Sequence, residues 1–260
     1  MTPGASSAPH QPDSVDVVVP AFNEEMRLAS SLVTLGGALA ALPLPASITV
    51  VDNGSTDSTA EVARATAGDV AVAVRVLSCP TRGKGAAVRH GLLAAGTRWS
   101  GFMDADLATS LDALPEVMAE LRRGASVVVG SRRHDMSHLL VDHDALRRVG
   151  GWAFRTAARR VVPGVSDTQC GFKFFDAAVA KELVRDQLVA GWAFDVELLS
   201  RAQSRGLVVR EVPVGWRNRP GSRFSPVRDG LASFRDLAVI RSRARRERRE
   251  QPATALPLAR

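Results

Sequence analysis

The sequence predicts an α/β fold: one domain in which helices flank a mainly parallel central sheet. Short apolar, β-branched runs alternate with longer helical patterns from residue 15 onward, and this alternation favours a parallel sheet. The 260 residues are 45% hydrophobic and 23% charged, which is ordinary for a globular protein and sufficient for one large domain. Polar side chains recur where the apolar runs end, which is where open α/β sheets bind ligands.

The first half of the chain contains predicted strands that are each followed by a helix. The strands cover residues 15–19, 48–51, 72–77 and 99–103. Three of the helices cover residues 24–41, 58–67 and 111–122. A fourth begins at the glycine-rich stretch 82–85 and ends at residue 95. Pro20 ends the first strand, Gly54 permits a tight turn after the second, and Asp57 can cap the helix that follows.

The second half continues the alternation with longer helices. Its predicted elements are a strand at 125–130, an amphipathic basic helix at 145–162, an apolar strand fed by the polar loop that starts at Val165, helices at 176–185 and 193–205, and a strand at 207–214. We expect four segments in the chain: a disordered arm at 1–14, the α/β domain at 15–225, an amphipathic basic helix at 226–246 and a flexible tail at 247–260.

The C-terminal helix has two interpretations. An apolar face beside an arginine-rich face is typical of an interfacial helix, and equally of a helix packed on its own domain. The formal net charge is +7, and residues 241–250 carry six Arg against two Glu, so this end could also contact an anionic membrane surface or be solvated. Because no aromatic residues interleave with the arginines, we expect no nucleic-acid partner. The apolar face consists of Leu231, Phe234, Leu237, Ala238 and Ile240.

Cysteine use and hydropathy indicate the compartment. The two cysteines, Cys79 and Cys170, belong to no CxxC pair, which favours buried thiols in a reducing environment over a zinc site or a disulfide framework. No basic start precedes an apolar run, and no run approaches 18 apolar residues, so we expect neither a signal peptide nor a transmembrane helix. The expected location is cytoplasmic, with peripheral contact at the inner face of the membrane as an option.

Asp104 and Asp106 follow the buried strand 99–103 and form the first candidate site. Two carboxylates on a strand-end turn suit Mg²⁺ or Mn²⁺ carrying a diphosphate better than a metal that prefers thiolates. The alternative is that one aspartate caps the helix at 111–122 and the other is a solvated turn residue.

Other strand ends supply further polar groups. They are Asn23, Asp52 with Asn53, Lys84 and Arg132. Lys84 lies among glycines at a helix start, which favours an anion, but Ser78 and Gly85 break the P-loop pattern. The first strand is followed by Pro-Ala-Phe-Asn-Glu instead of a glycine fingerprint, which argues against NAD or FAD. Because so many polar groups collect at one sheet edge, a ligand site is favoured over chance helix caps.

Two downstream segments could complete the site. Asp195 begins the helix at 193–205, where it could cap the helix or line the cleft as a general base. Ser222 and Arg223 lie in a Pro-Gly-Ser-Arg turn that could close on a phosphate, although a plain surface loop has the same composition.

Seven motifs occur in order along residues 15–230. They read VVPAFNEE, VVDNGSTD, RGKGAAV, DADLAT, GSR, DTQCGFK and WAFDVEL. Together they resemble the family 2 glycosyltransferases, most closely the dolichyl-phosphate (polyprenyl-phosphate) β-glucosyltransferases. The resemblance implies a GT-A-type, Rossmann-like domain and inverting sugar transfer. The last two motifs and the Pro-Gly-Ser-Arg turn carry the narrower part of the resemblance.

The resemblance also implies roles for individual residues. Pro20, Phe22, Glu24 and Asp52 would hold the nucleoside, with Asn53 standing where the family often has a second Asp that accepts from the base. Lys84 would bind donor phosphate, and Asp104 and Asp106 would bind Mg²⁺ or Mn²⁺. The phosphates of donor and acceptor would be surrounded by Arg132, Lys173, Ser222 and Arg223, and the residues closest to catalysis would be Asp106, Arg132 and Asp195.

We therefore expect a metal-dependent hexosyltransferase that moves a sugar, glucose by analogy, from a UDP-sugar to a polyprenyl phosphate. An ionised phosphate needs little help from a base, and basic side chains suffice to hold it. One alternative keeps the donor but uses a soluble hydroxyl acceptor, such as a secondary metabolite or a cell-wall precursor, with Asp195 as base. Another alternative, of a different class, is a non-catalytic protein that binds a nucleotide-sugar.

Overall fold

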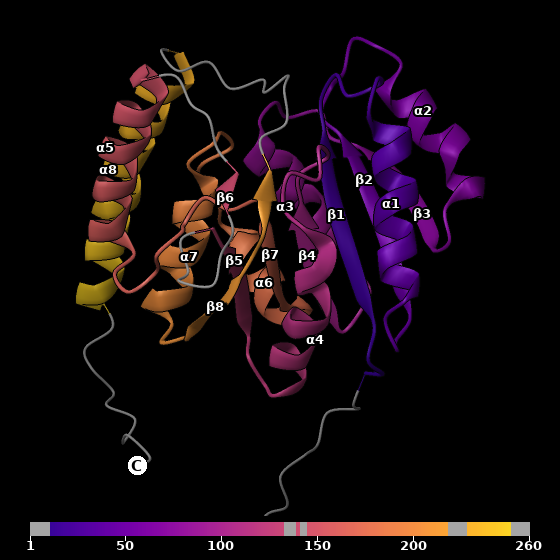
Figure 1. Cartoon of the computed structure of the whole chain (residues 1–260). Helices are drawn as coiled ribbons and strands as arrows, with labels where there is room; N and C mark the ends of the chain where they lie inside the picture. Colours follow the sequence, from indigo (N-terminus) through magenta and orange to yellow (C-terminus); the bar gives the residue numbers. More distant parts are fainter. Residues whose placement is uncertain (1–10, 133–138, 141–144, 218–227, 251–260) are drawn as a thin grey trace, which may run out of the picture.

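A seven-stranded sheet forms the centre of the computed structural model, which describes residues 11–132, 139–140, 145–217 and 228–250 (Figure 1). The strand order is β3-β2-β1-β4-β7-β5-β8. The bounds are β1 Val15–Ala21, β2 Ala46–Asp52, β3 Ala73–Ser78, β4 Trp99–Met103, β5 Val127–Ser131, β7 Phe172–Asp176 and β8 Val209–Pro213. A separate two-stranded pair joins β6, Leu139–Leu140, to β9, Trp216–Arg217.

The sheet is parallel except at one strand. β1 pairs in parallel with β2 and β4, and β5 does so with β8, whereas β7 runs antiparallel between β4 and β5. The predicted α/β class with a mainly parallel sheet is therefore confirmed. The expected strands and the observed ones differ by at most two residues at either end.

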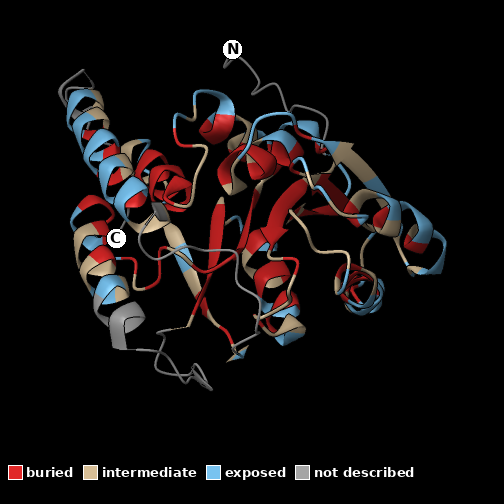
Figure 2. Cartoon of the chain, turned by 90° about the horizontal axis from the view of Figure 1, so that it is seen from above, coloured by how far each residue is buried: buried red, intermediate tan, exposed pale blue. Residues whose placement is uncertain are grey.

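Helices cover both faces of the sheet. Their bounds are α1 Leu28–Ala40, α2 Thr59–Thr66, α3 Lys84–Ala94, α4 Leu114–Arg122, α5 Ala145–Val161, α6 Ala177–Arg185, α7 Phe194–Ser204 and α8 Arg228–Glu250, with 3-10 turns η1 Ala67–Asp69 and η2 Leu111–Ala113. Figure 2 shows buried residues gathered in the sheet and on the inner sides of the helices. Helices α1, α2 and α4 contribute to one core, and α3 and α5 to α8 contribute to the other.

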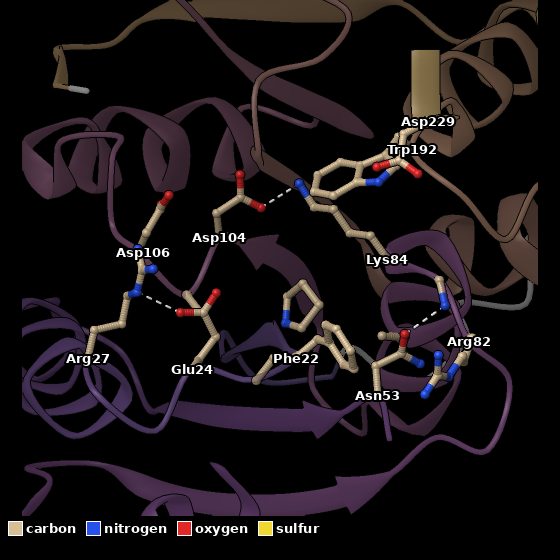
Figure 3. Close-up of a pocket in the computed structure, with 15 residues that line it drawn as sticks. Phe22, Glu24, Arg27, Asn53, Arg82, Lys84, Asp104, Asp106, Trp192 and Asp229 are labelled. Atoms are coloured by element: carbon tan, nitrogen blue, oxygen red, sulfur yellow. Dashed lines mark hydrogen bonds and ion pairs between the residues drawn. The ribbon is translucent and has the colours of Figure 1, made fainter. Parts of the chain in front are cut away.

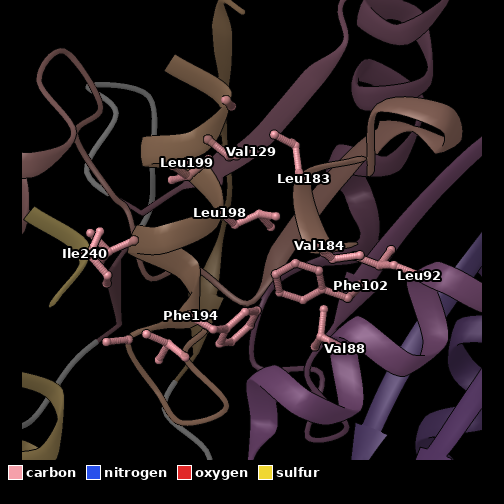
Figure 4. Packing of buried hydrophobic residues seen from close by; sticks show 14 of the residues in the cluster. Val88, Leu92, Phe102, Val129, Leu183, Val184, Phe194, Leu198, Leu199 and Ile240 are labelled. Carbon is pink, nitrogen blue, oxygen red and sulfur yellow. The ribbon is translucent and has the colours of Figure 1, made fainter. Parts of the chain in front are cut away.

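Alternation along β1 explains why both faces carry a core. Successive strand side chains point to opposite faces, so Val15, Val17 and Val19 enter the core under α1 while Val18 enters the opposite core. The second core centres on Phe102, whose ring lies 5.5 Å from that of Phe194 (Figure 4). A strand buried on both faces is nearly all apolar, and the exception here is Asp16, whose carboxylate accepts from the hydroxyls of Ser47 and Thr49.

The predicted helix at 24–41 begins later, at Leu28. Asn23 has a positive φ of 54°, and the Glu24 N–H donates to Thr59 Oγ1 at 2.8 Å. This contact between distant segments holds residues 24–27 as a turn and delays the helix by one turn.

Helix α8 packs on the domain against α5 and α7, and Figure 1 shows α5 and α8 side by side. Leu237 and Ile240 are buried in the core, and the Phe234 ring meets that of Phe154 edge-on at 5.6 Å. Leu231, by contrast, is 71% exposed. Part of the apolar face of α8 therefore packs on the domain, and part of it is exposed to solvent. Among the residues described, no helix combines the length and apolar character that crossing a membrane requires.

The close approach of α3 to β1 depends on Gly91. A Cβ at this position would overlap both methyl groups of Val18. We expect Gly91→Ala to lower the free energy of unfolding by about 1–3 kcal/mol, because neither a core helix nor a central strand can shift freely. Denaturant unfolding measures the change.

The matched control is Gly37→Ala, an exposed position inside α1 where an added Cβ meets nothing within 4 Å. Alanine should stabilise that helix by roughly 0.5–1 kcal/mol. Equal effects of the two substitutions would show that the packing of α3 on Val18 is unimportant.

Candidate functional site

A cavity of about 360 Å³ opens at the carboxyl ends of β1, β2 and β4, beside the first turn of α3 (Figure 3). It brings together seven of the residues selected from the sequence, namely Pro20, Phe22, Glu24, Asn53, Lys84, Asp104 and Asp106. These residues are far apart along the chain. They meet because parallel strands place their carboxyl ends at one edge of the sheet.

Asp104 and Asp106 lie in a tight turn after β4. Leu107 has a positive φ of 47°, and its N–H donates to the Asp104 carbonyl at 3.1 Å. The Ala108 N–H donates to Asp106 Oδ1 at 3.0 Å. The helical segment that follows is capped by Ser110, whose side chain accepts from the Asp112 N–H. Neither aspartate of the turn is that cap.

Lys84, the first residue of α3, faces this turn across the cavity. Its Nζ lies 2.5 Å from Asp104 Oδ1 and 5.5 Å from the centroid of the Trp192 ring (Figure 3). Burial acts to lower the pKa of Lys84, but the carboxylates of Asp104, Asp195 and Asp106 outweigh burial, and the pKa is raised. Lys84 is therefore firmly protonated and acts as a fixed positive charge.

Asp106 sits in a less favourable environment for a charge. Burial raises its pKa, and the neighbouring Asp104 carboxylate adds to the rise. Beside Asp106, on the side of the cavity away from Lys84, Arg27 Nε lies 2.6 Å from Glu24 Oε2 and contributes positive potential at Asp106 (Figure 3). A cation bound between the Asp104 and Asp106 carboxylates would reduce the repulsion between them.

The donor set of this turn fits a hard divalent ion. Within the residues that the structure describes, no group of three or more His, Cys, Asp or Glu side chains could hold a metal by itself. Mg²⁺ is commonly held by one or two carboxylates together with substrate phosphates. Asp104 and Asp106 supply that number of carboxylates, and Asp104 already pairs with a cation, Lys84.

The other end of the cavity is shaped by Phe22, Asn53 and Arg82. The Arg82 guanidinium lies 5.8 Å from the centroid of the Phe22 ring. The Asn53 amide donates to the Thr81 carbonyl at 2.7 Å and accepts from the Gly83 N–H at 2.7 Å. Asn53 therefore braces the loop that presents Arg82 and Lys84. Asp52 is not in the cavity lining, and its carboxylate accepts from the Ser55 N–H at 3.3 Å.

Arg132, expected at the site, is held just after β5 by Asp167. Arg132 Nε lies 2.6 Å from Asp167 Oδ2, and a second nitrogen of the guanidinium lies 2.9 Å from Oδ1. Burial would raise the pKa of Asp167, but the contact with Arg132 outweighs burial and the pKa is lowered. Arg132 is not in the cavity lining, although its side chain is 26% exposed.

Lys173 and Asp195 form an ion pair in the core. Lys173 is fully buried, and its Nζ donates to Asp195 Oδ1 at 2.5 Å and to the Cys170 carbonyl at 2.6 Å. Burial raises the pKa of Asp195, and Lys173 opposes the rise. Neither residue lines the cavity. Ser222 and Arg223 lie outside the described residues.

Sequence reasoning missed four charged or aromatic residues of the cavity wall: Arg27, Arg82, Trp192 and Asp229. Arg82 and Trp192 are the first residues of the motifs RGKGAAV and WAFDVEL, in which other residues were selected, and Arg27 lies three residues after Glu24. Asp229 belongs to the first turn of α8, far along the chain, and no local pattern marks it.

The fold and the cavity define an α/β protein with a polar ligand site at the carboxyl edge of its sheet. Residues 16–184 match the family model "Glycosyl transferase family 2", and this chain belongs to that family of glycosyltransferases. It is 32% identical to dolichyl-phosphate beta-glucosyltransferase of Dictyostelium discoideum over 88% of this chain and 74% of the relative. It is 37% identical to the Drosophila melanogaster enzyme of the same name, over 87% of this chain and 74% of the relative.

Solved structures agree on the fold. Glucosyl-3-phosphoglycerate synthase from Mycobacterium tuberculosis in complex with uridine diphosphate superposes with a TM-score of 0.67 at 22% identity, covering 93% of this chain and 82% of that one. The same enzyme with Mn²⁺, UDP and glucosyl-3-phosphoglycerate gives a TM-score of 0.62 at 21% identity, with the same coverage.

The bracing role of Asn53 leads to a prediction. In Asn53→Asp a carboxylate faces the Thr81 carbonyl and cannot donate to it. We expect the free energy of unfolding to fall by about 1–3 kcal/mol, because the Arg82–Lys84 loop loses its brace. Chemical denaturation measures the change.

Asn23→Asp is the matched control, because the hydrogen-bond partner of the Asn23 amide nitrogen is the Thr56 hydroxyl, which can turn to donate instead. That change should be tolerated. If Asn53→Asp were tolerated equally well, the Asn53 amide would not be the brace.

The Arg132–Asp167 pair leads to a second prediction. The pKa of Asp167 is lowered in the folded protein, so the pair stabilises the fold at neutral pH and this contribution is lost as pH falls through that lowered pKa. Asp167→Asn should lower the free energy of unfolding by roughly 3 kcal/mol near pH 7. This is the low end of the range for a buried ion pair, because Arg132 is partly exposed. Urea unfolding of both proteins from neutral to acid pH measures this.

The difference from wild type should shrink towards zero at acid pH. Asp69→Asn, an exposed substitution, should stay within about 0.5 kcal/mol of wild type throughout. A difference independent of pH would contradict an electrostatic origin.

Proposed function

We propose that this glycosyltransferase moves glucose from UDP-glucose to a polyprenyl phosphate with inversion at the anomeric carbon. The observation that carries the proposal is the order of groups along one cavity. Phe22, Asn53 and Arg82 lie at one end, and the charged set of Lys84, Asp104 and Asp106 lies at the other. This order matches a nucleoside followed by a diphosphate. The names of the relatives supply the sugar and the lipid phosphate.

In this proposal Asp104 and Asp106 hold Mg²⁺ or Mn²⁺. The ion would neutralise charge that develops on the departing diphosphate. Lys84 supports the same charge with a fixed ammonium, because its raised pKa keeps it protonated. Phe22 and Arg82 hold the nucleoside, and Arg27 with Glu24 borders the cavity beside Asp106.

The acceptor is proposed to be a phosphate because it brings its own negative charge. A phosphate monoester is ionised near neutral pH and attacks without losing a proton to the enzyme. Asp195, the expected base for a hydroxyl acceptor, has its carboxylate occupied by buried Lys173 and lies outside the cavity wall. This supports a phosphate acceptor. Arg132 is proposed to face the acceptor phosphate through its exposed part, with Ser222 and Arg223.

The second candidate is a soluble hydroxyl acceptor. The solved neighbours include complexes with phosphoglyceric acid, an acceptor of that kind. Their identity to this chain is at the level of fold, and the relatives with higher identity are named for a lipid phosphate. The lipid phosphate is therefore the primary proposal.

A peripheral membrane contact through α8 remains part of the proposal. Leu231 is 71% exposed and Phe234 is 40% exposed, and arginines follow on the same helix. Such a surface would let the enzyme reach a lipid acceptor from the water side. The expected location is thus the aqueous face of a membrane.

The acceptor assay tests the function. Incubation of the enzyme with UDP-glucose and Mn²⁺ should glucosylate a short polyprenyl phosphate, and mass spectrometry should detect the product. EDTA should reduce turnover at least about 100-fold, because the charge on the leaving group is no longer neutralised. Asp104→Asn should do the same even with Mn²⁺ present.

Parallel reactions with phosphoglyceric acid and with other UDP-hexoses distinguish the alternatives. Turnover with phosphoglyceric acid alone would favour the hydroxyl acceptor. UDP-glucose binding without turnover on either acceptor would contradict both acceptor assignments.

A further inference from the structure

Trp192 and Asp229 line the cavity at the end away from Glu24 and Arg27 (Figure 3). Both lie next to Lys84, on the side of Lys84 that is opposite Asp104 (Figure 3). Trp192 presents its ring to the Lys84 ammonium at 5.5 Å. The proposed function assigns neither residue to the nucleoside or the metal. Both border the cavity beside Lys84, whose ammonium also contacts Asp104.

We propose that Trp192 and Asp229 form the subsite for the hexose of the donor, an inference that rests on the proposed function. A nucleotide-sugar runs from base to ribose to diphosphate to sugar. With the nucleoside at Phe22 and Arg82 and the diphosphate at Lys84 and Asp104, the hexose extends towards the side that carries Trp192 and Asp229.

The chemistry of the pair matches a hexose. An indole ring offers an apolar face that can lie against the C–H face of a pyranose. A carboxylate accepts charge-assisted hydrogen bonds from hydroxyls. The same carboxylate repels a phosphate, so Asp229 is unsuited to the anionic acceptor, which must approach from another side.

The segment that carries Trp192 is fixed against α3. The Ala86 N–H donates to the Ala190 carbonyl at 3.2 Å, and the Gln187 amide donates to the Gly85 carbonyl at 3.0 Å. Buried Glu197 accepts from the N–H groups of Leu188 and Val189 at 2.9 and 2.8 Å. The loop before Trp192 is therefore fixed to the same helix end that presents Lys84, and this fixes the backbone from which the Trp192 ring projects.

Asp229 reaches the cavity because α8 packs on the domain. The Ser233 hydroxyl, on a residue that is 4% exposed, donates to the Asp229 carbonyl at 2.7 Å. Leu237 and Ile240, further along the helix, are buried in the core beside α7. The C-terminal helix α8 thus contributes the Asp229 carboxylate to the cavity, in addition to the exposed surface proposed to contact a membrane. This gives α8 a role in donor selection that its arginine-rich sequence does not reveal.

Calorimetric titration with UDP and with UDP-glucose, both with Mn²⁺, tests the subsite without any acceptor. Asp229→Ala should weaken UDP-glucose binding about 10- to 100-fold and change UDP binding less than about twofold, because only the sugar hydroxyls are lost as partners. Trp192→Ala should act in the same direction, and Trp192→Phe should restore most of the affinity. Circular dichroism melting confirms that each variant is folded.

Asp236→Asn serves as the matched control, since Asp236 is on the same helix and does not line the cavity. It should leave both affinities unchanged. Equal losses for UDP and UDP-glucose, or unchanged affinity for both in Asp229→Ala, would overturn the subsite. A loss of turnover with unchanged UDP-glucose affinity would also overturn it.

The two proposals fail in different ways. If wild-type enzyme binds UDP-glucose but transfers nothing to a polyprenyl phosphate, the proposed acceptor is wrong and the subsite stands on its own binding data. If Trp192→Ala and Asp229→Ala weaken UDP-glucose binding no more than they weaken UDP binding, the hexose does not contact this pair and the inference is wrong whatever the acceptor.

Discussion

The ion pair between Lys84 and Asp104 holds together the charged end of the cavity. It connects the first residue of α3, a helix that packs on β1, to the turn after β4. Asp104 is crowded by Asp106, and two neighbouring carboxylates without a cation repel each other. Lys84 supplies a cation beside them. In the proposed function, the phosphates of the donor and the metal ion would enter the space next to this ion pair.

A second layer of charges lies behind this pair. Lys173 and Asp195 pair in the core, and Asp195 contributes to the raised pKa of Lys84. Arg132 and Asp167 pair at the end of β5. Buried charges of this kind are tolerated only with matched partners, because an unpaired one keeps its full desolvation cost. The residues that sequence patterns single out as reactive therefore divide into those that face the cavity and those that support its walls.

Polar contacts between distant loops set the shape of the cavity. The amide of Asn53 fixes residues 81–83, and the loop before Trp192 is fixed to the first turn of α3. These contacts place Arg82, Lys84 and Trp192 around one space. Local sequence predicts that Asn53 lies at a strand end, but the partners of its amide come from another loop. For that reason its bracing role could not be predicted from the residues around it.

The sequence by itself determined the class of fold, the strands of the central sheet and the cluster of polar groups at their carboxyl ends. Hydrophobic period and turn residues are local properties, and parallel strands converge at one edge wherever they lie in the sheet. Only the tertiary structure decided that β7 runs antiparallel between β4 and β5, that Lys173 and Asp195 neutralise each other in the core, and that α8 brings Asp229 to the cavity. These features depend on which distant segments pack together. Local sequence gives several polar side chains an equal chance of facing the cavity, and only their burial and their charged neighbours in the folded protein decide which of them do.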